Sequence, residues 1–145
     1  MDHLQKKDVE YWLWEKENLN KEIVEYFWAN LWGSVWEIWQ CLLDYKNTWD
    51  YKVWVENLII DEYAKIFDLY TYELKENERE LFVKVNKKIV TKSEYNLELW
   101  ENIMDMIKKL VDIDIWFYES RKQRITANSR TTKKCFEKLV KEMEK

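Results

Sequence analysis

The sequence predicts an all-α protein, an antiparallel helical bundle of three to four long helices with a short C-terminal helix. Among 145 residues there is no proline and one glycine, while 47% of the residues are hydrophobic and 36% are charged. This composition suits long helices better than turn-rich sheets. Apolar residues also recur at intervals of three and four, which places them on one side of a helix. We expect a helical bundle over residues 1–120 and a basic tail with a short amphipathic helix over residues 121–145.

The first apolar series follows intervals of 4, 3, 4, 3 and 4 residues through Val24, Trp28, Leu31, Val35, Ile38 and Leu42. Gly33 lies within it and either kinks one helix or separates two. Ser34 and Glu37 have the spacing of a capping box, which indicates that a new helix can begin after the glycine. Both interpretations keep the segment helical.

The second series begins after a possible cap at Thr48 and contains Val55, Ile59, Tyr63, Ile66, Tyr70 and Leu74. Its phase resumes at Leu81, Val85 and Ile89, beyond the polar run KENERE, so the pattern predicts one very long helix or a broken one. Residues 81–90, LFVKVNKKIV, are rich in β-branched residues and also fit a short hairpin. We favour a helix there.

The third series predicts the clearest bundle helix, preceded by a capping-box candidate at Thr91: Leu99, Ile103, Met106, Leu110, Ile113 and Phe117. A last amphipathic stretch, with Thr132 as its possible cap, predicts the C-terminal helix: Phe136, Leu139, Val140 and Met143. This helix is too short to persist without packing on another element. Together the series predict helices that pack through their apolar sides.

Ten tryptophans and nine tyrosines are the second unusual feature of the composition. Trp28, Trp32, Trp36 and Trp39 form a stripe beside the first apolar series. They belong either to a wide aromatic core or to an exposed surface that binds a protein partner. Base stacking is disfavoured because residues 27–44 contain no lysine or arginine. A membrane span over residues 26–43 is also disfavoured, since Glu37 lies inside that run.

Charge is distributed unevenly along the chain. Residues 1–80 contain eighteen acids and nine bases, whereas residues 121–145 contain three acids and nine bases. The candidate partner-binding residues are the six cations that follow Glu119: Arg121, Lys122, Arg124, Arg130, Lys133 and Lys134. They form a solvated, flexible end that keeps the protein soluble or folds back on the acidic body, contact nucleic-acid phosphates, or dock on an acidic protein. An acidic body with a basic end also fits a cationic groove that normally holds nucleic acid.

Enzyme chemistry has little support in the sequence. The single histidine, His3, lies near the N-terminus, so the predicted helices contain no histidine to act as a base. One glycine cannot form a phosphate-binding loop, and Cys41 and Cys135 do not form a metal motif. We therefore expect a non-enzyme without cofactor, metal or small-molecule substrate. The N-terminus also lacks a secretory signal, so we expect the protein to remain in the cell that makes it.

Three stretches carry a resemblance: YWLWEKE near the start, WANLWGSVWEIW in the middle, and RKQRITANSRTTKK before the last helix. With its length and tryptophan content, the chain resembles the RNA polymerase inhibitors of two-tailed viruses of acid-loving archaea. The resemblance implies a helical-bundle protein in the host cytoplasm that enters the DNA-binding channel of the host DNA-directed RNA polymerase. There it would restrain the clamp, compete with DNA and block transcription. No site residue follows from the resemblance. A DNA-packaging virion coat protein, also a helical bundle, is the structural alternative.

Overall fold

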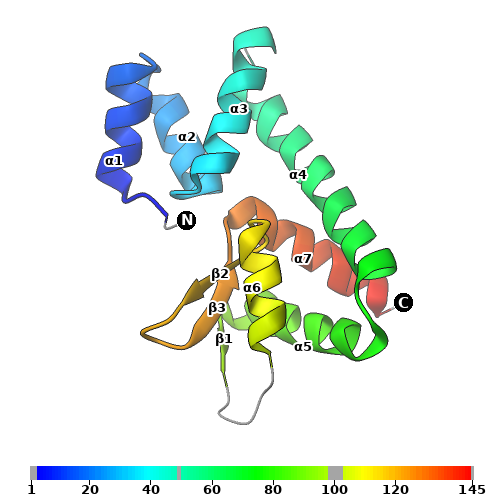
Figure 1. Ribbon diagram of the computed structural model, residues 1–145. Coiled ribbons are helices and arrows are strands. Elements are labelled where there is room, and N and C mark those ends of the chain that lie inside the picture. Colours follow the sequence, from blue (N-terminus) through cyan, green and yellow to red (C-terminus); the bar gives the residue numbers. More distant parts are fainter. Residues whose placement is uncertain (1–2, 49, 98–102, 145) are drawn as a thin grey trace. The chain divides into compact units, whose positions relative to one another are not determined.

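The computed structural model describes residues 3–48, 50–97 and 103–144, and these are mostly helical, as predicted (Figure 1). The chain divides into two compact units. Unit 1 contains residues 1–60 and 129–131, and unit 2 contains residues 61–128 and 132–145. The predicted boundary between residues 120 and 121 lies in the turn between two β-strands.

Unit 1 is helical. Its elements are α1 (Lys6–Glu10), the π-helical turns of η1 (Tyr11–Lys16), α2 (Lys21–Leu31), α3 (Val35–Thr48) and the first part of α4 (Tyr51–Asp68). Its core consists of buried apolar side chains from all of these helices: Val9, Leu13, Leu19, Ile23, Val24, Phe27, Leu31, Ile38, Cys41, Leu42, Trp54, Val55 and Leu58. Phe27 and Trp54 stack within it, with ring centroids 6.3 Å apart. The first apolar series therefore supplies much of the core of unit 1.

A new helix begins after Gly33, in agreement with the second interpretation of the sequence. The backbone amide of Leu4 donates to the Gly33 carbonyl oxygen at 2.9 Å, which brings the N-terminal segment against the glycine. A Cβ atom at position 33 would collide with the Leu4 backbone. The only glycine of the chain therefore marks a close backbone approach, and α3 begins at Val35.

Asparagine and aspartate side chains cap the starts of two helices in unit 1. Asn20 Oδ1 accepts a hydrogen bond from the amide of Ile23 at 3.0 Å at the start of α2. Asp50 Oδ1 accepts from the amides of Lys52 and Val53 at the start of α4. The predicted cap at Thr48 was wrong, because Thr48 is the last residue of α3. Asp50, the residue directly before α4, provides the cap instead.

Unit 2 contains the rest of α4, the π-helical turn η2 (Leu69–Glu73), α5 (Glu76–Lys92), α6 (Met104–Asp112), most of α7 (Arg130–Met143) and a small sheet. The second apolar series is broken, because Leu74 adopts an extended conformation between η2 and α5. Arg79 of α5 donates to the carbonyl oxygens of Tyr70 and Thr71 at 2.9 and 2.7 Å, which satisfies carbonyl groups in η2. Residues 81–90 are helical, as favoured from the sequence.

The sheet was not predicted. Its strands β1 (Tyr95–Asn96), β2 (Trp116–Glu119) and β3 (Arg124–Ala127) are antiparallel in the order β1-β3-β2. The prediction of one continuous helix from Leu99 to Phe117 was therefore wrong. The helix α6 ends at Asp112, Asp114 has a positive φ of 60°, and Phe117 lies in β2. Local sequence explains the change, since residues 115–118, IWFY, are β-branched and aromatic. Leu99 of the same series lies outside the described residues.

Two predicted caps in unit 2 were also wrong. Thr91 lies inside α5, where its hydroxyl donates to the carbonyl oxygen of Lys87 at 2.8 Å. The helix ends at Lys92, and the next residue, Ser93, has a left-handed backbone conformation. Thr132 is the third residue of α7, which begins at Arg130 directly after Ser129. In both places a threonine that resembles a cap in the sequence lies within a helix.

Aromatic rings dominate the core of unit 2. Phe82 is fully buried and contacts Trp116, Phe136 and Tyr70, with ring centroids 5.7, 6.3 and 6.4 Å away. The indole nitrogen of Trp116 donates to Asn86 Oδ1 at 2.9 Å, so the polar atom of this buried ring is paired. These contacts join α5, α7 and the sheet. None of the described helices is long and apolar enough to cross a bilayer.

Candidate partner-binding surfaces

The basic segment after Glu119 is folded in the structure. Residues 120–123 form the turn between β2 and β3, and residues 130–134 begin α7. In the pairing of β2 with β3, Glu119 lies opposite Arg124 and Tyr118 lies opposite Ile125. Successive side chains of β3 point to opposite faces of the sheet. Ile125 and Ala127 are therefore buried, whereas Arg124 and Thr126 are partly exposed. The interpretation of this segment as a flexible end therefore does not hold for residues 119–134.

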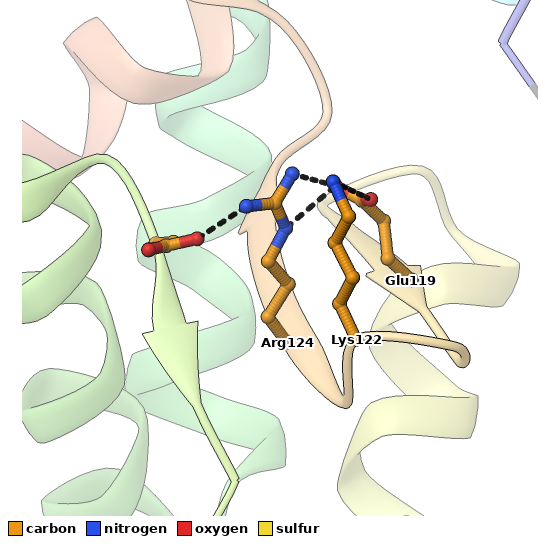
Figure 2. A network of polar contacts seen from close by, with 4 residues as sticks. Glu119, Lys122 and Arg124 are labelled. Atoms are coloured by element: carbon orange, nitrogen blue, oxygen red, sulfur yellow. Dashed lines mark hydrogen bonds and ion pairs between the residues drawn. The ribbon is translucent and has the colours of Figure 1, made fainter.

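Arg124 is the centre of a polar network in unit 2 (Figure 2). Its guanidinium donates to Glu119 Oε1 through Nε at 2.8 Å and pairs with the same atom through a terminal nitrogen at 2.7 Å. The other terminal nitrogen pairs with Glu94 Oε2 at 2.6 Å. Hydrogen bonds to Glu119 and then to Glu94 raise the pKa of Arg124 further above its usual value. Arg124 therefore braces the end of β2 to the residue that precedes β1.

The other predicted cations differ in their surroundings. Lys122 makes a longer ion pair with Glu119 at 3.8 Å, and Arg121 is exposed in the turn. Lys133 Nζ donates to the hydroxyl of Ser93 at 3.1 Å, and Lys134 is exposed on α7. Arg130 is exposed and belongs to unit 1. The structure thus gathers three of the six cations in one hairpin and distributes the others over α7.

The acidic excess lies in unit 1. By sequence, unit 1 contains eleven acids and seven lysines and arginines, whereas unit 2 contains seventeen of each. Exposed carboxylates of unit 1 lie on or directly before several of its helices: Asp8, Glu15, Glu22, Glu25, Asp50 and Glu56. The acid-rich start of the sequence continues to residue 80, but residues 61–80 belong to the unit whose charges balance.

Part of the tryptophan stripe is exposed on α3. Trp36, Trp39 and Leu43 are 39%, 52% and 43% exposed, and their spacing of three and four places them on one side of the helix. Trp28 and Trp32 are half-buried. The sequence left open whether the stripe forms core or surface, and it does both. We refer to Trp36, Trp39 and Leu43 as the α3 apolar face.

Glu37 lies between the two exposed tryptophans in sequence but is fully buried. Its Oε2 accepts hydrogen bonds from the hydroxyls of Ser129 and Thr131 at 2.8 and 2.5 Å, and these hydroxyls are 2.6 Å apart. The cluster holds residues 129–131 against α3 within unit 1. Sequence reasoning missed this role; the signal was a single charge in the apolar run of residues 26–43.

A groove of about 580 Å³ lies between α5 and α7 in unit 2. Its lining mixes charges of both signs with two valines: Lys87, Lys88, Val90, Thr91, Glu137, Val140, Lys141 and Glu144. Lys87 and Glu144 pair across it at 3.0 Å. Charges of both signs that pair with each other do not select one ligand class. Among the described residues, no three histidine, cysteine or acidic side chains are grouped as metal ligands.

Comparisons with models of protein families, with curated proteins and with solved structures gave no match for this chain. The chain has two surfaces that could bind a partner: the α3 apolar face with the acidic excess of unit 1, and the basic β2–β3 hairpin of unit 2.

Proposed function

We propose that the protein is a viral inhibitor of the host archaeal DNA-directed RNA polymerase. It binds in the DNA-binding channel, restrains the clamp and blocks transcription by occlusion. The observation that carries this proposal is the exposure of Trp36, Trp39 and Leu43 on a unit with an acidic excess. This combination suits a protein partner with a cationic surface, and the resemblance of the sequence directs the choice to polymerase.

The α3 apolar face supplies anchors for such an interface. Tryptophan is enriched among the residues that dominate binding energy at protein interfaces. Three side chains cover only part of the roughly 800 Å² that each partner of a stable complex buries. The remaining contact area comes from polar and acidic residues around the face, which meet the cationic walls of a channel built for nucleic acid.

Charge complementarity explains how the protein would compete with DNA for the channel. A channel that binds DNA is lined with lysine and arginine, so it attracts the acidic unit 1 and the DNA template by the same interaction. Occupation by the protein then excludes the template without chemistry at the polymerase active site. Attraction between exposed charges is screened by salt, so the association slows as ionic strength rises.

The test is binding to purified archaeal RNA polymerase in the absence of DNA. Immobilised polymerase is incubated with the protein at 50 and 300 mM salt, with and without nuclease treatment. We expect capture at both salt concentrations, weaker at the higher one, and no effect of nuclease. Capture that disappears after nuclease treatment would overturn the proposal. Assembly of the protein on duplex DNA into large particles, without binding to polymerase, would support the coat-protein alternative instead.

A further inference from the structure

We propose that the β2–β3 hairpin of unit 2 is a second binding surface, for the phosphate backbone of duplex nucleic acid. Arg121 and Lys122 in the turn are its contact residues, and Arg124 is a positioning residue. The proposal goes beyond polymerase binding, because it assigns a nucleic-acid contact to a surface that is separate from the α3 apolar face.

The hairpin has the shape that this contact needs. Two paired strands of four residues each, Trp116–Glu119 and Arg124–Ala127, extend from the helices of unit 2 to the turn (Figure 1). β1 pairs with β3 along its other edge, so the part of the hairpin that can approach a duplex is the turn rather than the strands. Its turn is exposed and consists of Ser120, Arg121, Lys122 and Gln123. Two cations, a hydroxyl and an amide are side-chain types that donate to phosphate oxygens.

The base of the hairpin is braced. The Arg124 guanidinium pairs with Glu119 at 2.7 Å and with Glu94 at 2.6 Å, so it ties the end of β2 to the segment before β1 (Figure 2). Arg124 is occupied by these two carboxylates and acts by holding the turn in place. Lys122 pairs with Glu119 at the longer distance of 3.8 Å and is largely exposed, so a phosphate can replace this contact.

The side chains of the hairpin favour a duplex over other anionic partners. The large apolar side chains that are exposed in the described part of the chain lie outside β2, β3 and their turn. A single-strand platform needs exposed rings for base stacking, and a membrane-inserting loop needs an apolar tip. Unit 2 has seventeen acids and seventeen lysines and arginines, so it does not repel phosphate as unit 1 does.

The experiment measures binding of a fluorescently labelled 30-base-pair DNA duplex by anisotropy between 50 and 200 mM salt, without polymerase. The variant Arg121→Gln/Lys122→Gln removes two charges from the turn. The matched control, Lys6→Gln/Lys7→Gln, removes two exposed neighbouring charges from α1 of unit 1. Circular dichroism checks that both variants fold.

Loss of two phosphate contacts lowers the salt slope of log K by about 1.8 and raises Kd roughly 60-fold at 0.1 M salt. We expect this change for the hairpin variant and an unchanged slope for the control. Equal losses in both variants, or no binding of the wild-type protein to the duplex, would overturn the proposal. So would tighter binding to a single strand, to polyglutamate or to anionic vesicles. Because polymerase is absent, the result is independent of the proposed inhibition.

A further variant tests the role of Arg124. Arg124→Gln removes the brace but no phosphate contact, so we expect a higher Kd with an unchanged salt slope. Arg124→Lys keeps one charge for the carboxylates and should restore part of the affinity. A fall of the slope by about 0.9 in Arg124→Gln would show that Arg124 itself contacts a phosphate, which would overturn its assignment as a positioning residue.

Discussion

Replacement of Trp39 by alanine is the sharpest test of the α3 apolar face. Trp39 is 52% exposed, and a tryptophan side chain offers up to about 250 Å² of surface, so roughly 130 Å² is available to a partner. At about 25 cal/mol per Å² its burial contributes about 3 kcal/mol to binding. Removal of the indole should therefore raise the Kd for polymerase roughly 200-fold, if the face lies at the centre of the interface.

The assay is isothermal titration calorimetry, in which the protein is titrated into purified polymerase and the Kd is measured. Tyr72→Ala is the matched control, because Tyr72 is an aromatic residue that is 79% exposed and lies on η2, which belongs to unit 2. Urea unfolding of each variant is needed as well, since about half of the Trp39 side chain is buried and contributes to stability. An unchanged Kd for a folded Trp39→Ala variant would show that the α3 apolar face does not bind polymerase, and an equal loss in Tyr72→Ala would show that the effect is not specific to that face.

Three further predictions concern stability, measured by urea unfolding. Phe82→Ala removes a fully buried ring that stacks on Trp116 and should lower the free energy of unfolding by about 3–5 kcal/mol; a loss below 1 kcal/mol would contradict this packing. Gly33→Ala introduces a methyl group against the Leu4 backbone and should cost about 1–3 kcal/mol, whereas a stabilised variant would contradict that contact. Burial, and secondarily the Glu56 charge, raise the pKa of Tyr26, so its stabilising contribution is complete below pH 10 and is lost as pH rises through the folded-state pKa. Tyr26→Phe should therefore lose less stability than wild type between pH 9 and 11, and parallel curves would disprove the shift.

Helices with long apolar series could be predicted from the sequence. The series through Val55 and Ile66 corresponds to α4, and the series through Val85 and Ile89 corresponds to α5. Both have buried residues at the expected spacing, because the period of an amphipathic helix is a local property. The break at Leu74 lies next to the polar run that interrupts the pattern.

The sheet could not be predicted in the same way. Ile113 and Phe117 fit the helical spacing, yet residues 115–118 also have the β-branched and aromatic composition of a strand. These residues form β2 because they pair with β3. β3 in turn pairs with β1, which is about thirty residues earlier in the sequence. Such pairings between distant segments do not leave a periodic signal in one sequence.

The candidate surfaces could also be predicted only in part. The cluster of cations after Glu119 could be read directly, but the engagement of Arg124 with Glu94, thirty residues away in sequence, could not. The exposure of Trp39 and the burial of Glu37, on the same helix, also depend on tertiary contacts. Composition therefore indicated the chemistry of the surfaces, and only the fold separates the side chains that are exposed from those that hold the protein together.

Release of template DNA from polymerase tests the proposed occlusion directly. A complex of archaeal RNA polymerase with labelled promoter DNA is titrated with the protein at fixed salt, and free and bound DNA are quantified together with bound protein. Occlusion predicts that one equivalent of bound protein releases one equivalent of DNA, and that excess DNA displaces the protein. A stable complex that contains polymerase, protein and all of the DNA would contradict occlusion.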